Sequence, residues 1–278
     1  SRVCSIDEMT NISKKNREIL SECYCVGRRE PLEAMHSADG TIKFLLGEPN
    51  AAVEAVYIPD ADRATLCVSS QKGCKMNCTF CMTGKQGFHG DLTATEIINQ
   101  ILSIPNSDKL TNVVFMGMGE PMDNIDPVMT ALEIMTSEWG LNWSPKRITV
   151  STIGKLDTMK RLLNDSKVHI AISVHSPFHE ERLSLMPVEK AYPMKSVMAM
   201  LRDYDFAHQR RLSIEYIMWN GLNDDIAHAE ALVKLLRGNT VRVNLIRFHA
   251  IPGVELKSSN EENMVKFRDY LNSNGVIC

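Results

Sequence analysis

The chain has 278 residues, of which 44% are hydrophobic and 23% are charged, and its formal net charge is −3. This size and composition suit one globular α/β domain, and no apolar run approaches the roughly 20 residues of a membrane span. The N-terminal residues have no apolar core of a secretory signal, so we expect a cytoplasmic protein that does not associate with membranes. The acidic balance gives no general support for nucleic-acid binding, which usually shows a basic excess.

The predicted elements begin with a helix over residues 13–23 and a hairpin with strands at 41–46 and 52–58. After Pro59, strand-like and helical runs alternate, which predicts a parallel sheet with helices outside it. The expected strands lie at residues 66–68, 112–116, 147–152, 169–174, 211–218 and 241–248. The expected helices between and after them lie at residues 94–104, 126–138, 155–164, 194–204, 225–237 and 260–273.

Six strand–helix units predict an open, partial (β/α)6 barrel of the TIM-like kind, with its functional face at the carboxyl ends of the strands. We therefore expect a division of the chain at Pro59. Residues 1–59 form a small extension with a helix and a β-hairpin, and residues 60–278 form the barrel.

Three cysteines in the pattern Cys74-x3-Cys78-x2-Cys81 follow the first barrel strand. A 4Fe–4S cluster normally takes four thiolate ligands, so three would leave one iron open to bind another molecule. Structural zinc also needs four ligands, and Cys23 and Cys25 have the wrong spacing to complete such a site. A disulfide framework suits short secreted chains. The polar loop argues against ordinary core packing, so the pattern favours an open iron–sulfur cluster over these alternatives.

Polar or glycine-rich groups follow several of the later strands. The second strand ends in the run Gly117-Met118-Gly119-Glu120, where glycine permits close backbone approach and Glu120 could accept hydrogen bonds from an ammonium group. A tight turn with a helix-starting Glu would give the same pattern. The other strand ends carry Ser151, Ser173, Val174, His175 and His249. A ring of such groups at successive strand ends predicts a binding site on that face.

The cysteine pattern on the first loop of such a barrel resembles the radical S-adenosylmethionine enzymes. Within that superfamily the chain is most similar to the dual-specificity RNA methyltransferases that methylate adenine at carbon 2. The resemblance rests on residues 57–59, 62–71, 73–74, 117–121, 151–152, 173–177, 185–187, 223–224 and 244–246. It implies that 23S ribosomal RNA and transfer RNA are the substrates. The remaining alternatives are the related carbon-8 methyltransferases, which confer antibiotic resistance, and a non-catalytic iron–sulfur or zinc protein that binds RNA.

The resemblance also implies the cofactors and their ligands. Cys74, Cys78 and Cys81 would bind a 4Fe–4S cluster, whose open iron binds S-adenosylmethionine and, with one electron from a flavodoxin-like donor, yields a 5′-deoxyadenosyl radical. The implied contacts to S-adenosylmethionine are Gly119, Glu120, Ser151, Ser173, Val174, His175 and His249, the last standing where the family usually has Asn.

Two catalytic roles follow from the same resemblance. Cys67 occupies the position of the Cys that resolves a covalent protein–RNA adduct by forming a disulfide, and Glu54 that of the base for the carbon-2 proton. The methyl group would first be carried by another Cys, in an Ala-Ala-Cys-Gly-type motif that the family has about one strand and a loop beyond the position of Cys278. Helix 13–23 would be the last helix of the family's N-terminal helical domain.

Overall fold

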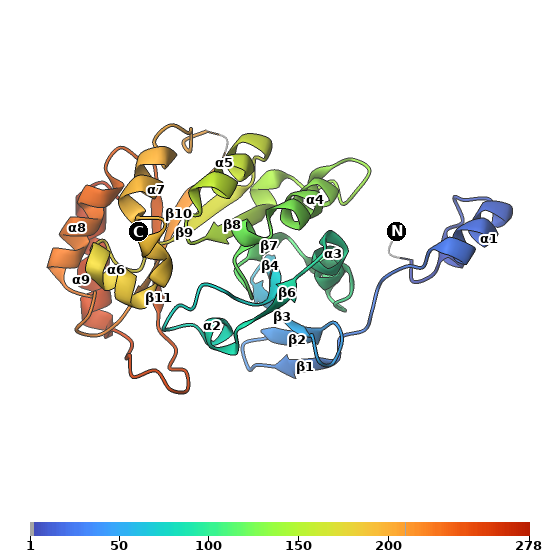
Figure 1. The fold of residues 1–278 in the computed structure, drawn as a ribbon, viewed down its shortest axis with the longest axis horizontal. Coiled ribbons are helices and arrows are strands. Elements are labelled where there is room, and N and C mark those ends of the chain that lie inside the picture. Colours follow the sequence, from blue (N-terminus) through green and yellow to red (C-terminus); the bar gives the residue numbers. More distant parts are fainter. Residues whose placement is uncertain (1–2, 209) are drawn as a thin grey trace.

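The computed structural model describes residues 3–208 and 210–278, which form a nine-stranded sheet flanked by helices (Figure 1). The main sheet has the strand order β1-β2-β3-β4-β7-β8-β9-β10-β11, and β5 and β6 form a separate pair. The strands are β1 (Glu33–His36), β2 (Ile42–Leu46), β3 (Val53–Asp60), β4 (Arg63–Cys67), β5 (Gln71–Gly73), β6 (Phe88–Asp91), β7 (Asn112–Phe115), β8 (Ile148–Thr152), β9 (His169–Ser173), β10 (Leu212–Met218) and β11 (Arg242–Arg247). The α-helices are α1 (Lys14–Cys23), α2 (Met82–Gln86), α3 (Ala94–Leu102), α4 (Ile125–Thr136), α5 (Leu156–Asp165), α6 (His179–Leu185), α7 (Met194–Leu201), α8 (Ile226–Leu236) and α9 (Glu261–Ser273).

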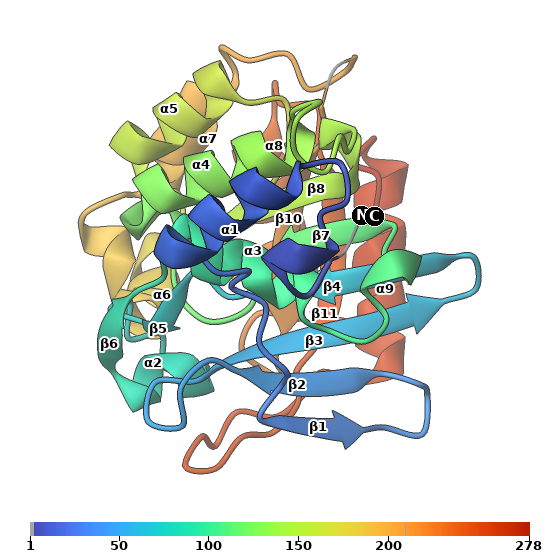
Figure 2. The same cartoon turned by 90° about the vertical axis from the view of Figure 1, so that its right-hand side faces the viewer.

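The six strands β4, β7, β8, β9, β10 and β11 of the main sheet are parallel to one another. A helix follows each of them along the chain, and these helices surround the strands in Figures 1 and 2. This confirms the predicted partial (β/α)6 barrel. All seven helices that the periodicity predicted are present, with ends within three residues of those expected.

Alternating burial along the strands separates the two faces of the sheet. In β8, Ile148, Val150 and Thr152 are buried, whereas Thr149 and Ser151 are half-buried. Ile148 and Val150 join the main hydrophobic core under the helices. Strand register places the following residues on the opposite face, which we call the inner face: Cys67, Val114, Thr149, Ser151, Ala171, Ser173, Glu215 and Asn244. This face carries small and polar side chains and is open for a ligand.

Three antiparallel strands, β1 to β3, extend the barrel sheet beyond β4 (Figure 2). Val56 of β3 pairs with Cys67 of β4, so the hairpin continues the same inner face. The predicted hairpin is confirmed as β2 and β3, and β1 adds a strand that was not predicted. Helix α1 lies apart from the body of the molecule and has no buried residue (Figure 1). The division of the chain at Pro59 stays a prediction.

A second, smaller hydrophobic cluster lies beneath the cysteine loop. Its buried members are Ile153, Leu185, Met186, Trp219 and Phe248, and Phe80 and Cys78 pack against it. Each buried member follows or lies near the carboxyl end of a barrel strand or the end of α6. This cluster gives the loop an apolar base at the functional face of the barrel.

No helix in the described residues is long and apolar enough to cross a membrane.

Candidate active site

The cysteine loop lies between β5 and α2, directly after the first barrel strand. The Cys74 amide donates to the Gly87 carbonyl at 2.9 Å, which closes the loop at its base. Gly73 has a φ of +79°, and a side chain there would place its Cβ 1.8 Å from the Gly87 oxygen. Only glycine fits this close crossing of two backbone segments.

All three loop cysteines are free thiols and half-buried. Burial, together with the charge of neighbouring thiolates, raises the pKa of Cys74 to about 11 and that of Cys78 to about 12. Thiolates crowded in this way need a bound cation to offset their repulsion, and soft thiolates are the ligands of iron–sulfur clusters. The donor set therefore fits the predicted cluster. Among residues 3–208 and 210–278, no three His, Cys, Asp or Glu side chains already converge as a metal site, so the ligand assignment stays a prediction.

Phe80, the aromatic residue before Cys81, anchors the loop on the barrel. Its ring centroid lies 5.0 Å from that of His175, in an edge-on contact, and 5.0 Å from that of Trp219. The Thr79 amide donates to the Leu185 carbonyl at 3.0 Å, which joins the loop to the end of α6. The loop and the predicted cofactor residue His175 are therefore parts of one packed unit.

Glu120 lies at the end of the second barrel strand and is 3% exposed. Its carboxylate accepts hydrogen bonds from the Thr152 hydroxyl at 2.5 Å, the Ile153 amide at 3.0 Å and the Met122 amide at 3.1 Å. Burial raises the pKa of Glu120 to about 7, although these three donors oppose the rise. A buried carboxylate with these properties is suited to receive a cationic group such as an ammonium.

Gly119 holds the Glu120 backbone against β5. Its φ is +95°, and a Cβ would lie 2.5 Å from the Cβ of Gln71. The Glu120 amide donates to the Gln71 side-chain oxygen at 2.8 Å. The sequence alone did not show whether Gly119 serves only a tight turn. The structure shows that glycine is needed both for the positive φ and for the close approach of the Gly119 backbone to Gln71.

His175 is 4% exposed and has a left-handed φ of +59°. Burial lowers the pKa of its imidazole to about 3, with the Arg182 cation adding to the effect. Its Nδ1 accepts from the Ile217 amide at 3.1 Å, so the neutral ring carries its proton on Nε2. His175 is therefore an uncharged hydrogen-bonding group at the end of the fourth barrel strand.

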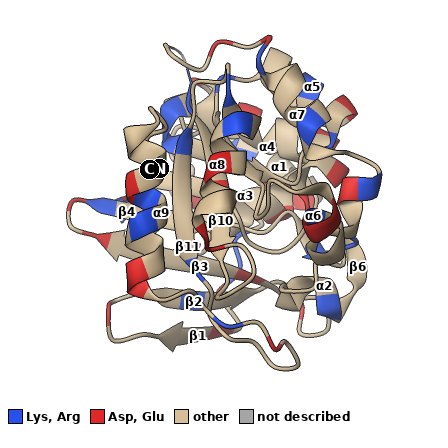
Figure 3. Cartoon of the chain, turned by 90° about the vertical axis from the view of Figure 1, so that its left-hand side faces the viewer, with Lys and Arg blue, Asp and Glu red and all other residues tan. Residues whose placement is uncertain are grey.

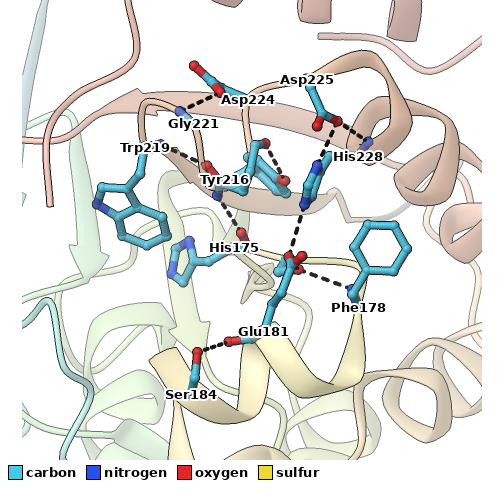
Figure 4. A network of polar contacts seen from close by, with 12 residues as sticks. His175, Phe178, Glu181, Ser184, Tyr216, Trp219, Gly221, Asp224, Asp225 and His228 are labelled. Carbon is cyan, nitrogen blue, oxygen red and sulfur yellow. Dashed lines mark hydrogen bonds and ion pairs between the residues drawn. The ribbon is translucent and has the colours of Figure 1, made fainter.

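The side chain of Asn223 holds His175 and the end of β10 together. Asn223 is fully buried, and its Nδ2 donates to the carbonyls of His175 at 2.6 Å and Ile217 at 2.8 Å. Its Oδ1 accepts from the Trp219 amide at 2.7 Å. Figure 4 shows His228 between the carboxylates of Asp225 and Glu181. Its Nδ1 lies 2.7 Å from an Asp225 oxygen, and its Nε2 lies 2.9 Å from a Glu181 oxygen.

Arg182 fixes the backbone at the ends of β8 and β9, as Asn223 does at the end of β10. This role was not predicted from the sequence. Arg182 is completely buried and ion-paired with Glu189. Its guanidinium donates to the carbonyls of Ser173 at 3.0 Å, Val174 at 3.1 Å and Ile153 at 3.2 Å. It therefore fixes the backbone of two predicted contacts to S-adenosylmethionine.

The remaining predicted site residues are less closely grouped. Ser151 lies on the inner face of β8, in register with Ala171 of β9. His249 is exposed just after β11. Five of the predicted site residues are therefore connected through hydrogen bonds and close packing at the carboxyl ends of the strands: Gly119, Glu120, Ser173, Val174 and His175. In the part of the chain that the structure describes, no hydrogen bond or ion pair connects His249 to this group.

Glu54 and Cys67 lie on the same inner face, on neighbouring strands. Cys67 pairs with Val56, and Glu54 is two residues from Val56 along β3. The Ser69 hydroxyl donates to the Glu54 carbonyl at 2.7 Å and accepts from the Met118 amide at 2.9 Å. This hydroxyl connects the hairpin, the first strand and the glycine-rich loop before Glu120.

The two side chains have contrasting surroundings. The Glu54 carboxylate is half exposed and pairs with Lys43 at 2.9 Å. Burial raises the pKa of the Cys67 thiol to about 11, so it is neutral at physiological pH. The Glu54 carboxylate is thus accessible to solvent, whereas the Cys67 thiol is largely protected from it.

These features define an enzyme of the radical S-adenosylmethionine class, and residues 68–236 match the model of the radical SAM superfamily. The chain is 34% identical to a radical SAM methyltransferase from Sphaerobacter thermophilus of known structure, with a TM-score of 0.91 over 99% of this chain and 83% of that one.

Curated relatives narrow the class further. The chain is 59% identical to the probable dual-specificity RNA methyltransferase RlmN of Phocaeicola vulgatus, over 100% of this chain and 80% of that protein. It is 42% identical to the dual-specificity RNA methyltransferase RlmN of Alcanivorax borkumensis, over 98% of this chain and 75% of that protein. The chain belongs to the RlmN family of radical SAM methyltransferases.

Proposed function

We propose that this protein methylates carbon 2 of adenine in 23S ribosomal RNA and in transfer RNA. The observation that carries the proposal is the shared inner face of Glu54 and Cys67, which the Ser69 hydroxyl links to the glycine-rich loop before Glu120. A carbon-2 methyltransferase needs a base, a thiol and a radical cofactor at one place. Membership of the RlmN family supports the choice of RNA as the substrate.

The chain's own residues supply the cofactor sites in this proposal. Cys74, Cys78 and Cys81 would hold a 4Fe–4S cluster, and Glu120 would accept hydrogen bonds from the amino group of S-adenosylmethionine. Together these groups supply, when bound, the one-electron chemistry that an electrophilic ring carbon requires. Ser151, Ser173, Val174, His175 and His249 would form the rest of the S-adenosylmethionine site.

Glu54 and Cys67 would act on the RNA adduct. Glu54 removes the proton from carbon 2 of the adenine, because its carboxylate is half exposed on the inner face, where it can meet the base. The Cys67 sulfur, after losing its proton, then attacks the sulfur of the methyl-carrying cysteine of the family's C-terminal motif. As the disulfide forms, the bond from that sulfur to the carbon on the adenine breaks, and the carbon takes up a proton to become the methyl group of the released base. Ile277 forms a parallel bridge with Arg242 of β11, so the chain at this point runs toward the carboxyl ends of the strands.

The partners follow from the same chemistry. A flavodoxin-like protein would supply the electron, and the target adenine must leave its stack to reach the inner face of the barrel. Both RNA substrates are cytoplasmic in a bacterium, so we propose that the enzyme works there.

Nucleoside mass spectrometry tests the proposal. The natural full-length protein, reconstituted anaerobically with iron and sulfide, is incubated with S-adenosylmethionine, a reductant and either RNA, which is then digested. We expect 2-methyladenosine from both RNAs. 8-Methyladenosine would indicate the carbon-8 branch, and S-adenosylmethionine cleavage that leaves both RNAs unmodified would rule out RNA methylation.

A further inference from the structure

A cavity opens at the end of the barrel opposite the candidate active site, where the parallel strands begin. Its volume is about 420 Å³. It is lined by Lys146, His169, Phe206, Ala207, His208, Arg210, Arg211, Leu212, Thr240, Val241, Arg242 and Ile277. Because β10 has seven residues at about 3.3 Å each, this cavity lies on the order of 20 Å from the carboxyl ends of the strands.

The basic residues of this cavity come from four adjacent strands. Lys146 lies in the 3-10 turn that leads into β8, His169 begins β9, Arg211 precedes β10, and Arg242 begins β11. Register places His169, Arg211 and Arg242 on the same face of the sheet. Figure 3 shows blue segments gathered at the upper end of β10 and β11, where these strands start. The fold therefore brings together cations that are far apart in the sequence.

These charges are not neutralised by neighbouring carboxylates. No Asp or Glu lines the cavity. In residues 3–208 and 210–278, Lys146, Arg210, Arg211 and Arg242 take part in no salt bridge, and the nearest acidic contact is that of Asp205 with His208 at its rim. A concave, uncompensated cluster of one sign focuses the field on an anion.

Arg210 gives a second, independent indication of a ligand. Its side chain is 6% exposed, and its Nη2 donates to the carbonyls of Leu163 at 2.7 Å and Ser166 at 2.6 Å. Its Nη1 is buried and has no hydrogen-bond partner in the described part of the chain. A buried cation with an unsatisfied donor is unfavourable, and the charge of an anion in the adjoining cavity would lower the cost of burying the guanidinium.

His169 adds a directed donor. Its Nδ1 accepts from the Arg211 amide at 2.9 Å, so the neutral ring carries its proton on Nε2. Burial lowers the pKa of His169, and the cations of Arg211, Lys146 and Arg210 lower it further. The imidazole is therefore a neutral N–H donor beside the cations of the cavity.

We propose that this amino-end cavity is a binding site for phosphate groups. Several guanidinium groups with one lysine match phosphate, which accepts paired hydrogen bonds from arginine and carries more charge than a carboxylate. The phosphates belong either to an RNA backbone or to a free polyphosphate such as that of a nucleotide. The site is separate from the candidate active site, and the proposal goes beyond the function proposed above.

The test compares two double variants of the full-length protein. Arg211→Ala with Arg242→Ala removes two cations from the cavity. Lys160→Ala with Lys234→Ala removes two exposed cations on the outer helices α5 and α8, with the same change in net charge. Both proteins are titrated calorimetrically with sodium tripolyphosphate and with a short single-stranded RNA of mixed sequence, and thermal unfolding checks that each is folded.

We expect the cavity variant to bind tripolyphosphate about tenfold more weakly or worse, and the helix variant to match the unmodified protein. If RNA affinity and its salt dependence fall as well, the natural source is an RNA backbone. If RNA binding is unchanged, the source is a free polyphosphate. Absent tripolyphosphate binding in the unmodified protein, or equal weakening in both variants, would overturn the proposal. Failure of the proposed methylation would leave these binding results unaffected.

Discussion

The carboxylate of Glu120 accepts a 2.5 Å hydrogen bond from the hydroxyl of Thr152, and this contact joins the ends of two adjacent parallel strands. Burial sets the chemistry of the pair, because it raises the pKa of Glu120 to about 7. A carboxyl group whose pKa is higher in the folded than in the unfolded chain makes the protein less stable as pH rises between those two values.

Glu120→Gln should therefore remove part of the pH dependence of stability. Between about pH 4.5 and pH 7 the folded chain retains a proton that the unfolded chain has lost, so the free energy of unfolding falls by up to about 3 kcal/mol from this group. Urea unfolding at pH 5, 6, 7 and 8 measures the effect. The difference between variant and unmodified protein should grow in favour of the variant up to pH 7 and then level off. Parallel curves would show that Glu120 ionises normally.

Gly119→Ala should damage the cofactor site more than a glycine change of the same backbone type elsewhere. At Gly119 the new Cβ would clash with Gln71 at 2.5 Å, whereas at Gly221 (φ +70°) it would meet nothing within 4 Å. Gly221→Ala carries only the conformational cost of about 1–2 kcal/mol. We expect a larger loss of melting temperature for Gly119→Ala, together with weaker binding of S-adenosylmethionine in equilibrium dialysis. Equal effects of the two changes would refute the close approach.

Asn223→Asp tests the positioning of His175. The substitution keeps the size of the side chain but replaces the donor to the His175 and Ile217 carbonyls with a repelling oxygen. We expect a loss of roughly 3 kcal/mol of stability, since two buried acceptors lose their partner. His175 should also become accessible to diethyl pyrocarbonate. As a control, Asn274→Asp changes an exposed amide that also donates to a carbonyl; protection of His175 in both variants would count against the role given to Asn223.

Cys67→Ala and Glu54→Ala should stall the full-length enzyme at a covalent RNA adduct. Carbon–carbon bond formation precedes both proton removal and disulfide closure in the proposed function, so RNA should remain attached when either residue is missing. A denaturing gel with labelled RNA detects the slower-moving species, and cleavage of S-adenosylmethionine should continue. Free methylated RNA from the Cys67→Ala enzyme would reject the resolving role.

The barrel was predictable because each of its parts has a local signal. Alternation such as that of β8 marks half-buried strands, and the cysteine spacing marks the first loop. β1 was missed because all four of its residues are exposed, so no burial pattern is present and pairing with β2 alone creates the strand. The pair β5 and β6 was missed because its residues, Gln71–Gly73 and Phe88–Asp91, are nearly all polar or glycine and show no apolar alternation.

The site was predictable only where function constrains residues that are close in sequence. The run Gly119-Glu120 and the cysteine loop could be read directly. The roles of Arg182 and Asn223 could not, since both hold strand ends through contacts to backbone carbonyls, and any sequence can provide those carbonyls. The cations of the amino-end cavity could not be predicted as a group either. Lys146 and Arg242 line the same cavity only because of the order of the strands in the sheet.

Isotope loss from the target adenine tests the central claim most directly. RNA substrates are prepared with adenine deuterated either at carbon 2 or at carbon 8, and the methylated nucleoside is isolated after reaction with the full-length, reconstituted enzyme. The proposed role of Glu54 predicts that the carbon-2 label is lost from every methylated adenine and that the carbon-8 label is retained. Loss of the carbon-8 label with retention at carbon 2 would contradict the account.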